Sequence, residues 1–376
     1  MKIAVTILAF CIAALLALGM VMLYSSSMAQ AGTHYLFMQM IWCSLGLMIC
    51  VTVASNDYQI LKKLAWPLFG LALLLLVLVL VPGIGRKING ARRWFDFGGI
   101  RFQPSELAKL ALIVAMAWYG ERCQRQMDTW KRGILFPGLI IGSMLGLIFI
   151  EPDRGTTILM AAVTGAMLLI AGVKMKYVIP PFLAGAVALG FSLYHDPVRA
   201  KRIFSWINLE ESKSGTGYQA YQAMLALGSG GWTGLGLGNG RQKLGFLPEH
   251  RTDFIFAVIG EELGLIATLL VVLTFVTIVA CGIFISARAR DKFGFLLGVG
   301  VTFLIGLQAF INIGVVTSAL PNKGLPLPFI SYGGSNLLAM LTCVGLLFSI
   351  ARQARDSRSA LAMPGRTGDF SSAQAT

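Results

Sequence analysis

Long apolar stretches separated by short polar segments fill most of this chain of 376 residues. Most of these stretches approach the length of about 20 residues that an α-helix needs to cross the hydrocarbon core of a bilayer. We therefore predict an all-α polytopic membrane protein with about ten transmembrane helices, whose ends are uncertain by about two to four residues. The predicted spans are residues 3–24, 36–54, 66–82, 105–120, 134–150, 156–173, 177–194, 254–285, 294–318 and 335–351.

Two polar segments interrupt this pattern. Residues 195–253 predict a large extracytoplasmic loop between the seventh and eighth helices, and residues 354–376 have the small, polar composition of a disordered tail. We therefore expect one membrane domain over residues 1–353. The apolar run from Ile3 to Tyr24 is longer than the core of a signal peptide, which is about 7–15 residues, so it predicts a retained first helix.

The composition supports a membrane protein. Hydrophobic residues make up 56% of the chain and charged residues only 13%, whereas about a quarter of a soluble domain is charged. The six cysteines have no metal-ligand spacing, so we interpret them as small buried hydrophobic residues. The sequence contains no nucleotide-binding motif, and we expect no nucleic acid partner.

Positive charge lies on both sides of the predicted membrane domain. Lysine and arginine in short loops mark the cytoplasmic side, and an even number of spans places both termini there. The opposite side carries nearly as many basic residues, and its short segment 83–104 alone holds five. We therefore expect an anionic ligand such as a phosphate on the outer face. Binding of anionic lipid head groups is the alternative.

Residues 90–109, GARRWFDFGGIRFQPSELAK, combine arginines, an interfacial tryptophan and a helix start. Pro104 and Ser105 begin the helix, and Glu106 lies in its first turn, where the helix dipole favours an acid. Glu106 and Lys109 are three residues apart, so they share a helix face and can pair. A lone lysine inside an apolar run costs about 2.5–3.5 kcal/mol, so Lys109 serves either a structural ion pair or a binding cavity.

A charged turn follows the fifth predicted span. Residues 151–155 read EPDRG, and Pro152 and Gly155 are ordinary turn formers. The turn does not by itself explain the two acids, Glu151 and Asp153. These acids either pair with the basic residues of the 83–104 segment or bind a divalent cation.

The large loop contains an amphipathic segment and a glycine-rich segment. Residues 217–227, GYQAYQAMLAL, place two tyrosines, Met224 and Leu225 on one helical face, which predicts a short helix lying in the membrane interface. Residues 228–245 hold eight glycines. Such a run permits close backbone approach and phosphate-binding nests, or it serves only flexibility.

An acidic residue ends the large loop where it meets the eighth span. Residues 247–265, LPEHRTDFIFAVIGEELGL, place Asp253 at the membrane surface beside basic residues. The helix dipole would lower the pKa of Asp253, whereas burial and the nearby Glu249 would raise it, and the sequence leaves this balance open. Glu261 and Glu262 point to different faces of the helix, so we expect at most one of them beside the cavity of Asp253.

A non-helical segment precedes the last span. Residues 320–336 read LPNKGLPLPFISYGGSN, and three prolines exclude a helix. Irregular backbone at the edge of a membrane requires burial in protein or a watery cavity. Lys323 is the basic residue of this segment. It either contacts a phosphate or is a solvated interfacial lysine.

Six segments together resemble the SEDS family of cell-wall proteins, which includes FtsW, RodA and SpoVE. The resemblance runs from the first span to about residue 353, and the segment around Lys323 is more similar to the FtsW branch than to RodA. Two positions depart from the family pattern: Arg251 separates His250 from Thr252, and Asn336 replaces a commoner serine. The matching segments are GARRW (90–94), FQPSE (102–106), EPDRGT (151–156), GLGLGNGRQKLGFLPE (234–249), TDFIFAVIGEELG (252–264) and LPNKGLPLPFISYGGS (320–335).

The resemblance implies a peptidoglycan glycosyltransferase that polymerises lipid II into β-1,4 glycan strands on the outer face of the bacterial cytoplasmic (inner) membrane. An α-linked diphosphate that becomes a β-glycoside requires inversion. A single displacement then needs one base at the acceptor hydroxyl and charge stabilisation at the departing undecaprenyl diphosphate. Asp253 would be this base in preference to His250. The residues expected to bind the substrate are Arg93, Arg101, Glu106, Lys109, Lys323 and Ser331.

The resemblance also implies cofactors and partners. No organic cofactor is needed because the donor carries its own leaving group, and a divalent cation, Mg²⁺ or Mn²⁺, would assist at the diphosphate. The expected partners are lipid II, the nascent glycan strand, a class B penicillin-binding protein that acts as a transpeptidase, and other membrane proteins of division or elongation. The alternatives are a lipid II flippase, which needs access from both leaflets and no base, and a scaffold for the transpeptidase, which needs neither.

Overall fold

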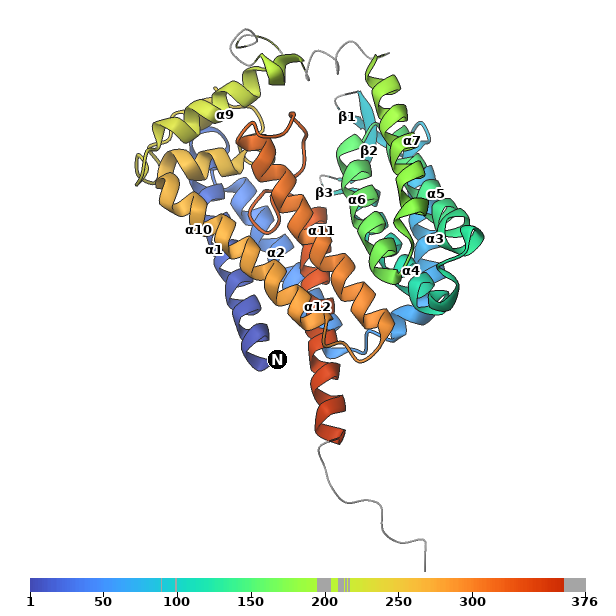
Figure 1. The fold of residues 1–376 in the computed structure, drawn as a ribbon. Coiled ribbons are helices and arrows are strands. Elements are labelled where there is room, and N and C mark those ends of the chain that lie inside the picture. The colour runs from blue at the N-terminus through green and yellow to red at the C-terminus, as the bar shows by residue number, and fades with distance from the viewer. Residues whose placement is uncertain are drawn as a thin grey trace, which may run out of the picture.

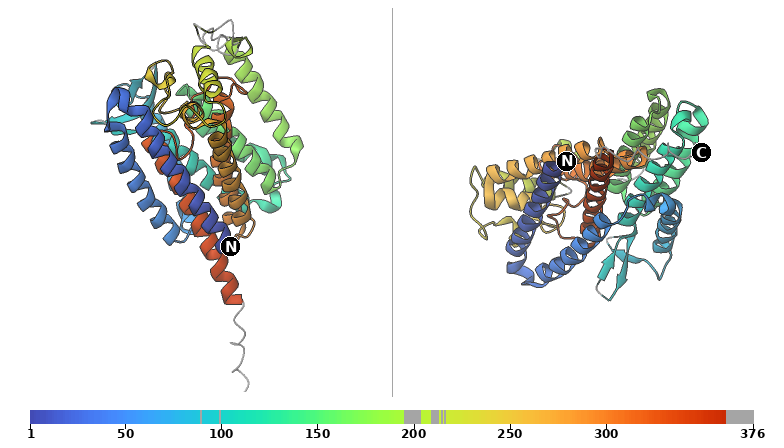
Figure 2. Two further views of the ribbon diagram at one scale, coloured as in Figure 1. Left: turned by 90° about the vertical axis from the view of Figure 1, so that its left-hand side faces the viewer. Right: turned by 90° about the horizontal axis from the view of Figure 1, so that it is seen from below.

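A bundle of long α-helices forms most of the molecule, and Figures 1 and 2 show the N-terminus and the end of α12 at the same end of this bundle. The computed structural model describes residues 1–88, 90–98, 100–194, 204–208, 213, 215 and 217–361. The helices are α1 (Lys2–Ala31), α2 (His34–Ser55), α3 (Ile60–Leu80), α4 (Pro104–Arg122), α5 (Phe136–Ile150), α6 (Arg154–Ala171), α7 (Met175–Tyr194), α9 (Tyr218–Ser229), α10 (Ile255–Ser286), α11 (Lys292–Val316) and α12 (Gly334–Leu361).

Helices occupy all of the predicted spans. Among the described residues, eight helical segments are long and apolar enough to cross a membrane. They correspond to α1, α2, α3, α5 with the preceding turn, α6, α10, α11 and α12. The remaining two predicted spans are α4 and α7. The predicted class, an all-α polytopic membrane protein, is therefore confirmed.

Helix α4 lies in the centre of the bundle. Of its 19 residues, 15 are buried, because it packs against α3, α6 and α11. Small residues allow this close packing. A Cβ on Gly300 of α11 would lie only 2.7 Å from the Cγ2 of Ile113 of α4. The charged residues at the start of α4 are thus carried into the protein interior rather than into lipid.

Helix α12 packs along α2 and extends beyond the predicted membrane domain. A Cβ on Gly345 would lie 2.7 Å from the backbone oxygen of Cys50, so the two backbones nearly touch there. We predicted a disordered tail from residue 354, but α12 continues to Leu361. Ala354 remains only 3% exposed, so this turn of the helix still has neighbours to pack against. Residues 362–376 of the predicted tail lie outside the described residues.

A small antiparallel sheet lies between α3 and α4, at the end of the bundle opposite the N-terminus (Figure 1). Its strands are β1 (Arg86–Ile88), β2 (Ala91–Phe97) and β3 (Ile100–Phe102), in the order β1-β2-β3. The sequence predicted only a basic outer segment here. The strands are short and rich in arginine, so the sequence gives little sign of the alternation of buried and exposed side chains that is typical of a strand. Ala91 and Phe95 of β2 are the side chains that turn inward.

The contact between α2 and α12 provides a test of the packing. We expect Gly345→Val to lower the free energy of unfolding by about 1–3 kcal/mol, because the added carbons overlap the Cys50 backbone. Gly165→Ala in α6 is the matched control, because nothing lies within 4 Å of its added Cβ. Thermal unfolding in detergent measures both variants. Equal unfolding temperatures would contradict the close approach of the two helices.

Candidate active site

Asp253 lies in the last turn of the large loop, directly before α10. Asn312 of α11 fixes this segment, because its side-chain amide donates to the backbone oxygens of Asp253 at 2.7 Å and Leu325 at 2.6 Å. A Cβ on Gly324 would lie 2.6 Å from the Oδ2 of Asp253. The Asp253 carboxylate therefore lies against the backbone of the proline-rich segment, and a glycine at 324 makes room for it.

Ser331 fastens the proline-rich segment 320–333 to the Asp253 segment. Its hydroxyl donates to the backbone oxygen of Thr252 at 2.5 Å and accepts from the backbone N–H of Leu327 at 2.8 Å. One residue further, the N–H of Tyr332 donates to the oxygen of Arg251 at 2.9 Å. Ser331 is only 3% exposed. Our prediction placed Ser331 among substrate-binding residues, and the structure places it in a buried hydrogen-bonded contact between two loops.

The environment of Asp253 raises its pKa to about 7. Burial is the largest cause, and the negative charges of Glu249 and Asp153 add to it. Phe254, not Asp253, is the N-cap of α10, so Asp253 lies outside the first helical turn, where the dipole would oppose this shift. The structure thus settles the balance that the sequence left open. A carboxylate with a pKa near neutrality is suited to accept a proton.

His250 is less suited to this role. Its side chain is 7% exposed, and Nδ1 lies 2.9 Å from the backbone oxygen of Leu247. Burial is the main cause of a lowered pKa for this imidazole. The ring therefore contributes to the fold of the loop end, and Asp253 remains the candidate base.

The charged turn after α5 lies beside this site. The Arg93 guanidinium donates from Nε to the backbone oxygen of Glu151 at 2.9 Å and from a terminal nitrogen to that of Pro152 at 2.6 Å. Asp153 caps α6 by accepting from the N–H and hydroxyl of Thr156. Arg93 thus binds the backbone of the turn, and Gln103 of the same segment donates to the Asp153 carboxylate at 3.2 Å. Arg93, a predicted diphosphate ligand, is engaged in holding this turn.

Glu151 is completely buried. Burial, with the negative charge of Asp153, raises the pKa of Glu151 to about 8, while the nearby Arg93 opposes the shift. We named a divalent cation as one role for these acids. Within the described residues, no group of three or more His, Cys, Asp or Glu side chains is placed to hold a metal ion.

Glu106 and Lys109 form a buried network instead of an open charged surface. Lys109 is 1% exposed; its ammonium lies 2.9 Å from Glu106 and donates to Gln308 of α11 at 3.0 Å. Gln308 in turn donates to the backbone oxygen of Pro326 and to the side chain of Asn336, both at 2.9 Å. This network joins α4, α11, α12 and the proline-rich segment. Of the two roles that we considered for Lys109, a structural ion pair and a binding cavity, this network corresponds to the structural ion pair.

Arg93, Arg101 and Lys323 are the predicted substrate-binding cations with exposed surface, whereas Lys109 is buried. The side chain of Arg101 is 55% exposed, and its Nε lies 3.8 Å from a carboxylate oxygen of Asp96. Lys323 is partly exposed and precedes Gly324, the residue beside Asp253. Arg101 and Lys323 therefore offer positive charge to a ligand at the end of the bundle that carries Asp253.

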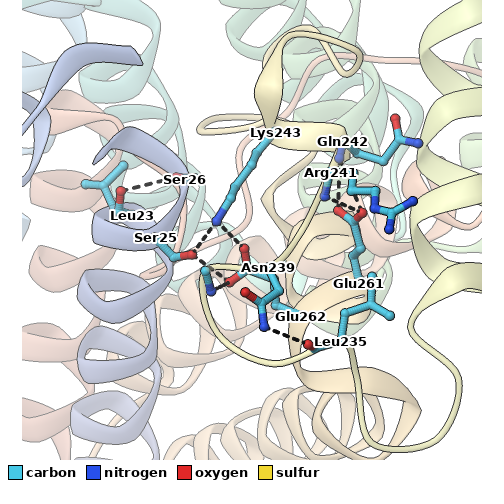
Figure 3. A network of polar contacts seen from close by, with 11 residues as sticks. Leu23, Ser25, Ser26, Leu235, Asn239, Arg241, Gln242, Lys243, Glu261 and Glu262 are labelled. Atoms are coloured by element: carbon cyan, nitrogen blue, oxygen red, sulfur yellow. Dashed lines mark hydrogen bonds and ion pairs between the residues drawn. The ribbon is translucent and has the colours of Figure 1, made fainter. Parts of the chain in front are cut away.

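The glycine-rich segment is anchored by Glu261 and Glu262 of α10, as Figure 3 shows. Glu261 accepts from the N–H groups of Arg241 and Gln242 at 2.7 and 3.2 Å. The predicted close backbone approach is present: a Cβ on Gly234 would lie 2.1 Å from the backbone oxygen of Glu262. The N–H groups of Arg241 and Gln242 do not form a phosphate-binding nest, because the Glu261 carboxylate already accepts from them.

Glu262 completes this anchor. It accepts from the N–H of Gly238 at 3.1 Å and from the hydroxyl of Ser25 of α1 at 2.6 Å, and it pairs with Lys243 at 2.5 Å. We expected at most one of the adjacent acids beside the cavity of Asp253, and the structure directs both of them to the glycine-rich segment. Both carboxylates contact the loop, because the loop folds over α10 next to a break at Gly264, where φ is 78°.

The fold and the site define a polytopic helical membrane protein with a carboxylate of raised pKa and exposed cations at one end of the bundle. The profile of the cell cycle proteins FtsW, RodA and SpoVE matches residues 6–356. The chain belongs to this family, as its sequence predicted.

The relatives support the same assignment. The probable peptidoglycan glycosyltransferase FtsW of Trichlorobacter lovleyi is 40% identical over 354 residues, which cover 92% of either chain. That of Coxiella burnetii is 40% identical over 352 residues, which cover 91% of this chain and 94% of the relative. Among solved structures, a chain of a peptidoglycan synthase complex has a TM-score of 0.78 at 28% identity and covers 92% of this chain and 97% of its own. RodA of Thermus thermophilus has a TM-score of 0.70 at 30% identity and covers 92% and 96%.

The Lys243–Glu262 pair gives a prediction about the loop. We expect Lys243→Met alone to lower the free energy of unfolding by about 3–5 kcal/mol, because it leaves the buried Glu262 carboxylate without its cation. The double variant Lys243→Met/Glu262→Gln should recover much of this loss. Thermal unfolding and the rate of proteolysis within the glycine-rich segment measure the effect. A double variant no more stable than the single one would argue against the pair.

Proposed function

We propose that this protein is a peptidoglycan glycosyltransferase that polymerises lipid II into β-1,4 glycan strands. The observation that carries the proposal is Asp253, a loop carboxylate whose pKa is raised to about 7 and which lies against Gly324, the residue that follows the partly exposed Lys323. Membership of the FtsW, RodA and SpoVE family supports the same activity, since the FtsW relatives are named as probable peptidoglycan glycosyltransferases.

The reaction is a single displacement with inversion. The 4-hydroxyl of the acceptor sugar attacks the anomeric carbon of the donor, and its proton passes to Asp253. The bond between the anomeric carbon and the diphosphate oxygen breaks, and undecaprenyl diphosphate leaves with the electron pair. Arg101 and Lys323 stabilise the negative charge that develops on this leaving group.

The other predicted residues hold the site in shape. Arg93 fixes the turn that carries Asp153, and Lys109 with Glu106 fixes the proline-rich segment through Gln308. Ser331 joins this segment to the residue before Asp253. A divalent cation, Mg²⁺ or Mn²⁺, would reach the site with the diphosphate of the substrate and neutralise part of its charge.

The setting of the reaction follows from the charge pattern. Basic short loops support a cytoplasmic location for both termini. Asp253 would then face the outer side of the cytoplasmic membrane, where it would meet lipid II and the nascent strand. A class B penicillin-binding protein is the proposed transpeptidase partner. The structural similarity to a chain of a peptidoglycan synthase complex supports such an assembly.

The decisive variant is Asp253→Asn. We expect it to abolish glycan polymerisation from labelled lipid II, because an amide cannot accept the acceptor proton. The raised pKa of Asp253 means that the folded state loses stability as pH rises from about 4 to 7, so the neutral amide should fold at least as well. Wild-type and variant protein are compared, each purified with its transpeptidase. Polymer from the variant would rule out Asp253 as the base, and lipid II translocation without polymer from either would favour a flippase.

The pH dependence tests the same residue. Because only the ionised carboxylate is a base, kcat/KM should rise with pH through about 7 and then level off. Glu249→Gln removes a negative charge that raises the pKa of Asp253, so the midpoint should move to lower pH. Asp128→Asn, an exposed acid paired with Lys174 on the side of the predicted cytoplasmic loops, is the control and should leave the profile unchanged. If the midpoint of the pH profile is the same in the Glu249→Gln variant as in the wild type, the role of Asp253 as the base is contradicted.

A further inference from the structure

A cluster of aromatic rings lies at the same end of the molecule as Asp253. Tyr35, in the first turn of α2, and Tyr332, in the proline-rich segment, pack edge to face with ring centroids 5.0 Å apart and an interplanar angle of 84°. The guanidinium of Arg251 lies 4.7 Å from the centroid of Tyr35. The two tyrosines and the arginine are all partly exposed. Three distant parts of the chain thus build one surface, the Tyr35–Tyr332 platform.

Hydrogen bonds from a buried glutamine fix the position of Tyr332 in the platform. Gln39, one turn after Tyr35 and only 2% exposed, donates from Nε2 to the backbone oxygen of Ser331 at 3.2 Å and accepts from the N–H of Gly333 at 3.4 Å. These two bonds bracket Tyr332. The N–H of Tyr332 itself donates to the oxygen of Arg251 at 2.9 Å. A buried amide therefore positions the ring, which is more than an aromatic side chain in a lipid-facing belt requires.

The platform is connected directly to the candidate base. Arg251 is two residues before Asp253, and the Ser331 hydroxyl, next to Tyr332, bonds to Thr252. Arg101 lies close enough for its positive charge to act on the Tyr332 hydroxyl, where it partly offsets the rise in pKa that burial and Tyr35 cause. Two aromatic rings and two guanidinium groups thus lie close together, on segments that are bonded to the residues directly before Asp253.

We propose that Tyr35 and Tyr332 form a saccharide-binding subsite beside Asp253, which receives the pyranose rings of a β-1,4-linked N-acetylated glycan. The inference rests on the proposed glycosyltransferase function and extends it to a subsite for the sugar part of the substrate. The apolar C–H face of a pyranose ring packs against the π-face of a tyrosine, and the surrounding hydroxyl and acetamido groups bond to polar neighbours. Arg251 supplies donors for those groups.

This subsite has a mechanistic consequence. A lipid diphosphate is held by charge, but charge alone does not fix the orientation of the sugar hydroxyl that reacts. A sugar ring packed on the platform is held beside the segment that carries Asp253, which restricts the approach of the acceptor. Tyr35 and Tyr332 would therefore be binding residues that determine the position of the sugar, and Gln39 a positioning residue that acts through Tyr332.

The first test measures binding without catalysis. Chitotetraose, a soluble β-1,4 oligomer of N-acetylglucosamine, is titrated into the purified full-length protein, and saturation-transfer NMR reports the dissociation constant. We expect Tyr35→Ala and Tyr332→Ala each to weaken binding about three- to tenfold, whereas Tyr35→Phe and Tyr332→Phe retain it because the rings remain. Tyr177→Ala, on α7 beside Lys176, is the matched control. Unchanged binding by both alanine variants, or no binding by wild type, would overturn the subsite.

The second test uses the lipid-linked substrate. Initial rates of polymerisation should show that Tyr332→Ala raises KM for lipid II and shortens the product strands, while the pH midpoint assigned to Asp253 stays at its wild-type value. A change in kcat alone would indicate a structural role and contradict the subsite. The two proposals can fail separately. If the wild-type protein binds chitotetraose but makes no polymer, the glycosyltransferase activity is contradicted. If the wild-type protein makes polymer and the alanine variants bind chitotetraose normally, the saccharide subsite is contradicted.

Discussion

The side-chain amide of Asn312 holds together the two irregular segments of the site. It donates to the backbone oxygens of Asp253 and Leu325, which belong to loops more than 70 residues apart in sequence. Neither loop has a helical hydrogen-bond ladder to define its position, and backbone groups near a membrane must be satisfied within the protein. The location of the Asp253 carboxylate against Gly324, and with it the raised pKa, depends on this bridge.

The same constraint explains how the protein uses its charges. Lys109 and Lys243 are buried beside carboxylates, and Arg93 binds the backbone of a turn. An unpaired charge in this low-dielectric interior is costly, so each of these cations has a partner that fixes a helix or a loop. Of the predicted substrate-binding cations, Lys109 is buried, whereas Arg93, Arg101 and Lys323 keep exposed surface. Arg101, Lys323 and Arg251 lie where the proline-rich segment meets the end of the large loop.

The glycine-rich segment shows why loop chemistry is difficult to derive from composition. Its glycines suggested either flexibility or a nest for phosphate, and both ideas are local. The structure instead brings Glu261 and Glu262 against the backbone amides of the loop, since α10 breaks at Gly264 and the loop folds over it (Figure 3). An anion does occupy the amides, but it comes from the chain itself. The short distance in sequence between the glycine-rich segment and α10 did not predict the contact between this segment and the two glutamates.

The sequence by itself determined the helical membrane fold, the family and the candidate base. Bilayer thickness sets the length of an apolar helix, so the spans could be located without knowledge of their neighbours. The joint presence of six motifs identified the family, and Asp253 lies near the start of one of them. Only the tertiary structure decided which charged residues are buried in ion pairs and which keep exposed surface. It also brought Tyr35 and Tyr332 together, because contacts between segments that are nearly 300 residues apart depend on how the helices pack, and no local pattern records that packing.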